Sequence, residues 1–237
     1  MRVTLFFTKN ISLKNWEQTG LLDREILLYK KLQKLYGVNF NFITYGNKDD
    51  VDVDKNFHIL PLNIHENRPF KVYKFYRLIS LYHQNLKNSD FFKTNQMDGA
   101  MTAVISKILY RKKLLLRTGY NWYEFAKSLD QPNYKIVYKY LYSLICYKFS
   151  DYIFVVSESE KQRIIKTFRL KNEKIIVMSN WVDTKRFYRK ESNRINEFLF
   201  IGRLEKQKGL FETIDLLYKT EWKLNIFGEG TLQQELV

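Results

Sequence analysis

The sequence has 237 residues, of which 45% are hydrophobic and 16% aromatic, so it can bury a core, and this composition excludes a disordered chain. Three prolines and nine glycines also exclude a collagen-like or loop-rich fibrous protein. The formal net charge of +15 favours anionic partners such as nucleic acid, phosphate ligands or acidic lipid, although a plain compositional bias would give the same value.

The cysteine content and the terminal residues predict a soluble chain of the cytoplasm. Cys146 is the single cysteine, so no disulfide can form within the chain, and we expect it to be a small buried residue. The N-terminal "MRVTLFFTKN" has an apolar run shorter than a secretory signal requires. The longest apolar stretch, 136–156, is interrupted by Lys139, Lys148 and Asp151, so we expect no membrane span.

Strand and helix patterns alternate from the N-terminus onward. In the first helical pattern Ile26, Tyr29 and Leu32 lie on one face, and Gly37 follows as a stop signal. Strands are expected at 2–7, 38–46, 56–60, 90–95, 113–119, 151–157 and 173–180, and helices at 21–36, 70–87, 98–110, 133–149 and 158–168. Such alternation predicts a Rossmann-like, doubly wound parallel sheet that binds ligands at the carboxyl ends of its strands.

The pattern changes after Asn180. A polar and basic stretch follows, and then the alternation restarts with strands at 198–202 and 222–228, a helix at 207–219 and the start of another helix at 231–237. We therefore expect an N-terminal domain at 1–180, a connector at 181–195 and an incomplete second α/β domain at 196–237.

The turn "GRLEKQKGL" follows the first strand of this second domain. We expect a buried strand to end at Ile201, with Gly202 turning the backbone and Arg203 at the carboxyl end of the strand. Lys208 is expected in the first turn of the next helix, where free N–H groups favour an anion. The two cations can converge on one phosphate group. The simpler alternative is that both are solvated surface charges.

Ordered motifs between Val155 and Val237 resemble GT-B glycosyltransferases of family four. "FLFIGRLEKQKGLFETIDLL", followed by "KLNIFGEGTLQQEL", is similar to the start of their donor-binding domain. "VSESEKQRIIKTFRLKNEKIIVMSNWVDTKRF" is similar to their crossover segment, in which Asn180 precedes the pair Val182 and Asp183. The resemblance implies a GT-B-like α/β fold with one complete Rossmann-like sheet and the first two βα units of a second.

The resemblance also implies a chemistry: transfer of a sugar from a nucleotide-sugar donor with retention at the anomeric carbon. Arg203 and Lys208 match the catalytic pair that holds the donor diphosphate, and cations at the departing group stabilise the charge that develops there. Gly202, Gly228 and Glu229 match the rest of the donor side. Since the nucleotide-sugar is a substrate, no cofactor and no metal ion is expected.

Further candidates lie in the first domain. Gly20 stands where the family often has a glycine-rich turn near the donor phosphates, and Thr19 equally suits a helix cap. Asp98 is expected to bind acceptor hydroxyls or, more simply, to cap the next helix, and Ser157 suits a similar cap. The loop after the strand at 113 is the predicted acceptor side, with Arg117, Thr118, Gly119 and Tyr120. Thr118 stands where many relatives carry a histidine, so no catalytic base is named, and Glu124 is a candidate only by its position in the sequence.

Three other patterns are weaker. "DDVDVD" at 49–54 resembles a paired-aspartate metal signature, but a solvated loop is the simpler interpretation. The histidines show no mutual ligand spacing, so no metal site is assigned to His58, His65 and His83. The basic, aromatic helix at 70–82 either rests on anionic lipid or presents a solvated face through Lys71, Lys74 and Arg77.

These observations lead to two main functional hypotheses. The first is a glycosyltransferase of cell-surface polysaccharide synthesis that uses a glycan or lipid-linked acceptor, in the cytoplasm or peripheral at the inner membrane face. The family's segment with a pair of glutamates is not found before Val237, so a truncated chain is expected. The alternative is therefore a catalytically dead fragment that retains acceptor or membrane-surface binding. A nucleic-acid binder rests on charge alone, and no nucleic-acid partner is expected.

Overall fold

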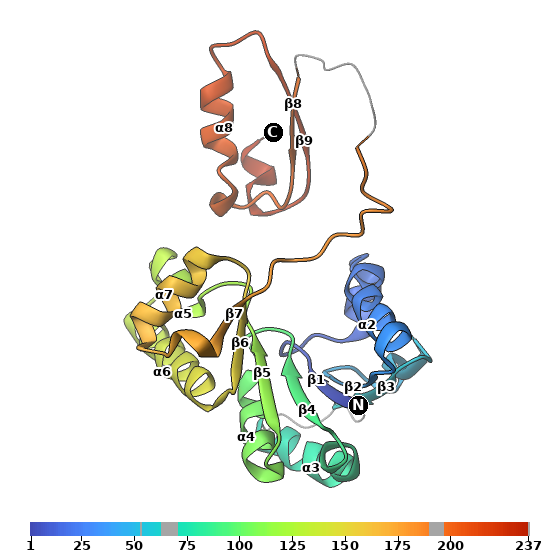
Figure 1. Cartoon of the computed structure of the whole chain (residues 1–237). Coiled ribbons are helices and arrows are strands. Elements are labelled where there is room, and N and C mark those ends of the chain that lie inside the picture. Colours follow the sequence, from blue (N-terminus) through green and yellow to red (C-terminus); the bar gives the residue numbers. More distant parts are fainter. Residues whose placement is uncertain (53, 63–70, 190–196, 237) are drawn as a thin grey trace. The chain divides into compact units, whose positions relative to one another are not determined.

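The computed structural model describes residues 1–52, 54–62, 71–189 and 197–236. The chain divides into two compact units, Met1–Trp181 and Val182–Val237 (Figure 1). The division lies one residue beyond 180, where the sequence predicts the end of the first domain. The acceptor-side and donor-side roles of the two parts stay predictions.

The first unit is built on a parallel sheet of seven strands. The strands are β1 (Arg2–Phe6), β2 (Asn39–Thr44), β3 (His58–Pro61), β4 (Phe91–Thr94), β5 (Lys113–Arg117), β6 (Tyr152–Val155) and β7 (Ile175–Val177). Their order in the sheet is β3-β2-β1-β4-β5-β6-β7, and neighbouring strands pair in parallel. The predicted doubly wound α/β sheet is therefore confirmed. The strand order reverses between β1 and β4, which places the ligand-binding crevice of such sheets beside these two strands.

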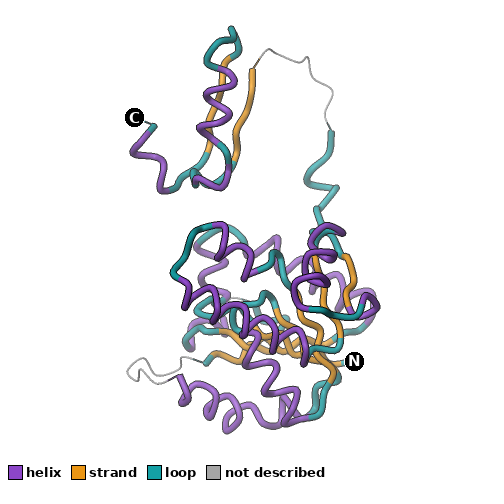
Figure 2. Tube along the Cα trace, turned by 90° about the vertical axis from the view of Figure 1, so that its left-hand side faces the viewer, coloured by secondary structure: helices purple, strands orange, loops and turns teal. Residues whose placement is uncertain are grey.

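Helices lie on both sides of these strands (Figure 2). They are α1 (Leu13–Gln18), α2 (Leu22–Tyr36), α3 (Lys71–Lys87), α4 (Ala100–Tyr110), α5 (Trp122–Ser128), α6 (Asn133–Phe149) and α7 (Glu158–Phe168). The predicted bounds of α6 and α7 are confirmed. α1 and α5 were not predicted, because helices of six and seven residues are too short to show a clear period.

Two buried clusters flank the sheet, because successive side chains of a strand point to opposite faces. Leu5 of β1 packs in a cluster with residues of α1 and α2, among them Trp16 and Tyr29. The next residue, Phe6, packs in a cluster with residues of α4 and α6, including Cys146. The predicted burial of Cys146 is confirmed, and burial raises the pKa of its thiol to about 12.

The three predicted helix caps have different outcomes. Ser157 is confirmed as the N-cap of α7, since its hydroxyl accepts a backbone hydrogen bond from the first turn. The cap proposed for Thr19 is wrong, because Thr19 ends α1 and the N-cap position of α2 is Leu21. The cap favoured for Asp98 is also wrong, since α4 begins after Gly99, whose φ of 94° suits a glycine.

The acidic stretch at 49–54 is not a solvated loop. Asp50 is 1% exposed, and its carboxylate accepts hydrogen bonds from the Lys14 amide at 2.8 Å and from the Thr44 hydroxyl. Asp54 is also buried and pairs with Lys30 at 2.7 Å. Both carboxylates therefore hold loops in place. Residues 53 and 65 lie outside the described residues, and within the described ones no three His, Cys, Asp or Glu side chains gather as a metal site.

The second unit is smaller. It contains β8 (Glu197–Ile201), α8 (Leu210–Leu217) and β9 (Lys223–Phe227), and the two strands pair in parallel. Leu204, Leu210 and Leu232 form its core. The predicted burial of the first strand is wrong in this unit, since Ile201 is 74% exposed, and Tyr218, predicted to face inward, is 84% exposed.

Glycines bring the loops after β8 and β9 into backbone contact. The Leu204 amide donates to the Glu229 carbonyl at 2.9 Å. A Cβ atom on Gly228 would lie 1.8 Å from the Gly202 carbonyl oxygen, and one on Gly230 would lie 2.3 Å from the Leu204 carbonyl oxygen. The "GEG" motif is therefore required for packing, whatever else it does.

We expect Gly228→Ala to destabilise the second unit by more than about 2 kcal/mol, because the clash is with backbone atoms that cannot rotate away. Hydrogen exchange of the β8 and β9 amides measures this. Gly20→Ala is the control. Gly20 also has positive φ, but no atom lies within 4 Å of the added Cβ, so we expect a loss near 1 kcal/mol in the first unit. Equal protection of β8 and β9 in Gly228→Ala and the parent would contradict the packing argument.

Candidate functional site

A cavity of about 410 Å³ opens at the carboxyl ends of β4 and β5. Its walls come from α1, α2, the segments that follow these two strands, and residues 178–181 after β7. The cavity lies beside the point at which the strand order reverses. This is the position at which open α/β sheets bind their ligands.

Arg117 forms part of the cavity wall at the end of β5. One guanidinium nitrogen donates to Asn180 Oδ1 at 2.7 Å, and the other donates to the Asn95 carbonyl at 3.5 Å. Beside it, the Gly119 amide donates to Gln96 Oε1 at 2.9 Å. The structure thus brings two of the predicted acceptor-side residues, Arg117 and Gly119, together with the side chain of Gln96, which follows β4, and that of Asn180 near the end of the first unit.

The other two predicted residues of this loop do not line the cavity. Thr118 is 1% exposed, and its hydroxyl donates to the Tyr120 carbonyl at 2.6 Å. The Tyr120 ring packs edge-on against Phe125 of α5, with ring centroids 5.0 Å apart. Thr118 therefore stabilises the loop conformation. Its side chain is buried and does not face the cavity in which an acceptor would bind.

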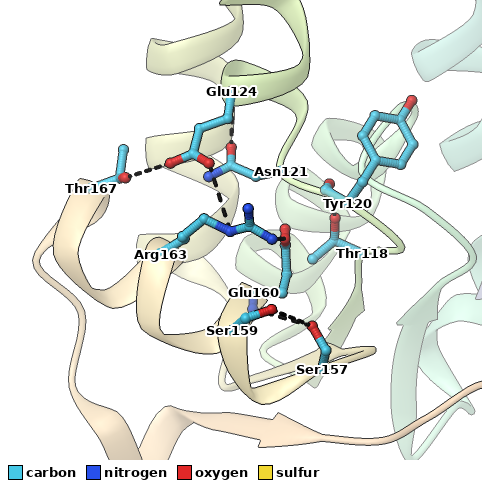
Figure 3. A network of polar contacts seen from close by, with 9 residues as sticks. All are labelled: Thr118, Tyr120, Asn121, Glu124, Ser157, Ser159, Glu160, Arg163 and Thr167. Atoms are coloured by element: carbon cyan, nitrogen blue, oxygen red, sulfur yellow. Dashed lines mark hydrogen bonds and ion pairs between the residues drawn. The ribbon is translucent and has the colours of Figure 1, made fainter. Parts of the chain in front are cut away.

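Glu124 belongs to a polar network that joins α5 to α7 (Figure 3). Its carboxylate accepts a hydrogen bond from the Thr167 hydroxyl at 3.2 Å and lies 3.9 Å from Arg163. Arg163 also pairs with Glu160 at 3.3 Å, and burial raises the pKa of Glu160 while Arg163 opposes the rise. Asn121 begins α5 by accepting from the Glu124 amide. The carboxylate of Glu124 thus contacts residues of α7 and does not line the cavity, where a catalytic base would lie.

Lys93 is one of several cavity residues that were not predicted from the sequence. It lies on β4, and its ammonium donates to the Tyr29 hydroxyl at 3.2 Å and to the Thr94 carbonyl at 3.4 Å. The pKa of Lys93 is lowered to about 7, chiefly by burial and also by the charge of Arg117, while Glu25 opposes the shift. A signal existed, because "DFFKTN" places a lysine inside a buried strand, where charged residues are rare.

Two tryptophans and an ion pair complete the wall. Trp16 of α1 stacks on Phe7, with ring centroids 4.4 Å apart. Trp181 lies under the Lys31 ammonium, 5.6 Å from the ring centroid. On α2, Arg24 holds Glu25 at 2.6 Å. The cavity therefore combines aromatic faces, amides and cations, a set that suits a polar ligand with a ring and a negative charge.

Two predicted residues of the first unit lie elsewhere. Gly20 forms the turn between α1 and α2 with a φ of 68°, and it is not part of the cavity wall. Asp98 precedes α4, where burial raises the pKa of its carboxyl group and Lys9 opposes the rise. Their proposed contacts with donor and acceptor stay predictions.

The predicted donor-side residues of the second unit lie in its loops. Gly202 and Arg203 follow β8, and Gly228 and Glu229 follow β9, so the two loops lie side by side. The predicted position of Lys208 is wrong in one respect. It lies in a 3-10 turn at Lys206–Lys208, and α8 begins only after Gly209. Arg203 and Lys208 are both exposed. This exposure fits a ligand-binding pair and a pair of solvated surface cations equally well.

A sequence profile of the family described as Glycosyltransferase Family 4 matches residues 27–186, more than half of the chain. The chain belongs to Glycosyltransferase Family 4. The match covers most of the first unit, including β4, β5 and the residues that close the cavity. The predicted family is therefore confirmed. No curated protein sequence matches this family member significantly.

Solved structures support the fold of this Glycosyltransferase Family 4 chain. The lipopolysaccharide outer core galactosyltransferase WaaB, in its apo form, aligns over 99% of the chain with a TM-score of 0.64 and 18% identity. HepE of Anabaena in complex with UDP aligns over 99% with a TM-score of 0.66 and 13% identity. Sucrose-phosphate synthase from Thermosynechococcus elongatus aligns over 96% with a TM-score of 0.68 and 9% identity.

The Family 4 chain spans 63%, 63% and 62% of these three proteins. At such identities the likeness shows the fold, and the predicted GT-B-type α/β class is confirmed. None of the helices in the described residues is long and apolar enough to cross a bilayer.

Proposed function

We propose that the protein is a retaining glycosyltransferase that moves a sugar from a nucleotide-sugar to a glycan or lipid-linked acceptor in cell-surface polysaccharide synthesis. The observation that carries the proposal is the Glycosyltransferase Family 4 match over residues 27–186. The UDP bound to the HepE structure supports a nucleotide-linked donor.

The donor is assigned to the second unit. When the glycosidic bond to the donor breaks, the departing nucleoside diphosphate gains negative charge. Arg203 and Lys208 would stabilise that charge, and Gly202, Gly228 and Glu229 would surround the nucleotide side. Cations placed where charge develops act on the transition state more than on the ground state. In this arrangement side chains of the chain stabilise the departing charge, and no metal ion or cofactor is assigned.

The acceptor is assigned to the first unit. The cavity beside Arg117 and Gly119 has the position of a ligand site in an open α/β sheet. Trp181, in its wall, offers an apolar ring of the kind on which sugar rings pack. In this arrangement the acceptor approaches over the carboxyl ends of β4 and β5.

We further propose that the protein rests on an anionic membrane at the cytoplasmic face. Helix α6 presents an exposed apolar and aromatic stripe consisting of Tyr134, Val137, Tyr138, Leu141, Ile145 and Phe149. Exposed Lys135 and Lys148 lie on the same helix, and such a combination suits an anionic lipid surface. The cations first considered for this role, Lys71, Lys74 and Arg77, lie where side chains are not described. Flotation with anionic vesicles tests α6, and we expect Leu141→Glu to reduce it.

Donor binding is tested by thermal shift of the intact protein with a panel of nucleotide-sugars. We expect one donor to raise the midpoint of the parent protein and to raise the midpoints of Arg203→Ala and Lys208→Ala by a smaller amount. Lys206→Ala is the matched control, since Lys206 is an exposed cation in the same 3-10 turn, and it should respond like the parent. If no donor shifts the parent, or if the two variants respond as the parent does, the donor assignment is wrong.

A further inference from the structure

The cavity of the first unit carries a surplus of positive charge. Three cations line it, namely Arg24, Lys93 and Arg117, against the single carboxylate of Glu25. Arg24 already holds this carboxylate at 2.6 Å. Lys93 and Arg117 therefore have no carboxylate partner of their own among the lining residues.

The hydrogen bonds of these two residues go to uncharged groups. Lys93 donates to the Tyr29 hydroxyl and to the Thr94 carbonyl, and Arg117 donates to Asn180 Oδ1 and to the Asn95 carbonyl. All four acceptors are uncharged oxygens. In the described part of the chain, neither Lys93 nor Arg117 forms a salt bridge.

This arrangement is unfavourable without a ligand. The two cations repel each other, and burial adds a desolvation cost for the lysine. An apolar side chain at position 93 would fill the same space between β4 and α2 without either cost. Perturbed cations of this kind gather where a ligand supplies the missing charge. An anion between Lys93 and Arg117 would remove both penalties.

We propose that this cavity binds a phosphate monoester carried by the acceptor, with Lys93 and Arg117 holding its oxygens. A phosphate monoester carries about 1.5 to 2 negative charges near neutral pH, which matches the surplus better than the single charge of a carboxylate. The guanidinium of Arg117 suits a phosphate, and the amides of Asn95 and Gln96 line the same cavity. That the phosphate belongs to an acceptor rests on the proposed transferase function. The anion site itself is inferred from the contacts of Lys93 and Arg117.

Titration calorimetry of the intact protein at fixed ionic strength tests the site with three compounds: glucose 6-phosphate, glucose, and dihexanoyl phosphatidic acid below its micelle concentration. We expect saturable binding of at least one phosphate monoester and none of glucose. Which of the two phosphate monoesters binds with higher affinity shows whether the site prefers a sugar phosphate or a lipid headgroup. Lys93→Met and Arg117→Met should each lower the affinity for the phosphate at least tenfold. If Lys93→Met does not fold, Arg117→Met still tests the site.

Lys113→Met is the matched control, because Lys113 is an exposed lysine at the opposite end of the neighbouring strand β5, and it should leave the affinity unchanged. Arg203→Ala should also leave it unchanged, so that loss of nucleotide-sugar binding and loss of the phosphate site are separate results. The inference is overturned if neither phosphate binds saturably, if Lys93→Met and Arg117→Met bind like the parent, or if Lys113→Met weakens binding equally. Displacement of the phosphate by UDP would assign the cavity to the donor and would also overturn it.

Discussion

Arg203→Ala is expected to lower kcat of sugar transfer by about two to three decades, with a smaller change in KM. Two unit charges 4 Å apart interact by about 4 kcal/mol at an effective dielectric of 20, and each decade of rate corresponds to about 1.36 kcal/mol. The leaving diphosphate gains only part of a charge in the transition state, so the interaction energy of two full charges is an upper limit for the loss. The loss should appear mainly in kcat, because the interaction strengthens as the bond breaks.

The measurement is steady-state transfer by the intact protein, with the donor that gives the thermal shift. Lys208→Ala should behave similarly, and Lys206→Ala should stay within a factor of a few of the parent. Lys206 has the same charge and the same exposed 3-10 turn as Lys208, so it separates a specific contact from the general field of the turn. Unchanged kcat in Arg203→Ala, or an equal loss in Lys206→Ala, would show that the turn does not hold the leaving group.

Lys93→Met is expected to be more stable than the parent at pH 6, and the advantage should shrink as the pH rises from about 7 toward 10.5. The pKa of Lys93 is lowered to about 7 in the folded protein, against an ordinary value of 10.5. Between these values the unfolded chain binds more protons than the folded protein, so the stability of the parent rises with pH. Below pH 7 both states are protonated, and the cost of the buried charge is fully present.

Each unit of pKa difference corresponds to about 1.36 kcal/mol, and relaxation around the charge reduces the total. We therefore expect the difference in free energy of unfolding between Lys93→Met and the parent to change by about 2 to 4 kcal/mol between pH 6 and pH 10. Urea denaturation of both proteins at pH 6, 8 and 10 measures it. Lys113→Met, at the exposed start of β5, is the matched control for replacing a lysine of the same sheet by methionine. Parallel stability curves for Lys93→Met and the parent would show that Lys93 is not charged at a cost in the folded state.

Local patterns were sufficient to predict most of the secondary structure. The bounds of α6 and α7 were predicted correctly because long amphipathic helices repeat their pattern over several turns. The parallel sheet was also predictable, because strands separated by helices must cross over the sheet. Short elements were not predictable in the same way. α1 and α5 are shorter than two turns, and α1 contributes Trp16 to the cavity wall, so sequence patterns said little about this part of the site.

The candidate site shows the same division. The sequence correctly pointed to the loop after β5, because parallel sheets bind ligands at the carboxyl ends of their strands. It could not tell that Thr118 is buried while Arg117 and Gly119 face the cavity, since that depends on which way the loop turns. It also could not show that Asp50 accepts from the Lys14 amide, a contact between residues far apart in the chain.

By itself, the sequence determined the α/β class, the family and the paired cations of the turn at 202–210, because each of these is carried by residues close together in the chain. Only the tertiary structure decided that Lys93 and Arg117 line one cavity and that neither has a carboxylate partner there. Charge balance in a cavity depends on which distant side chains meet, and here α2, β4 and β5 bring together residues from three separate parts of the sequence.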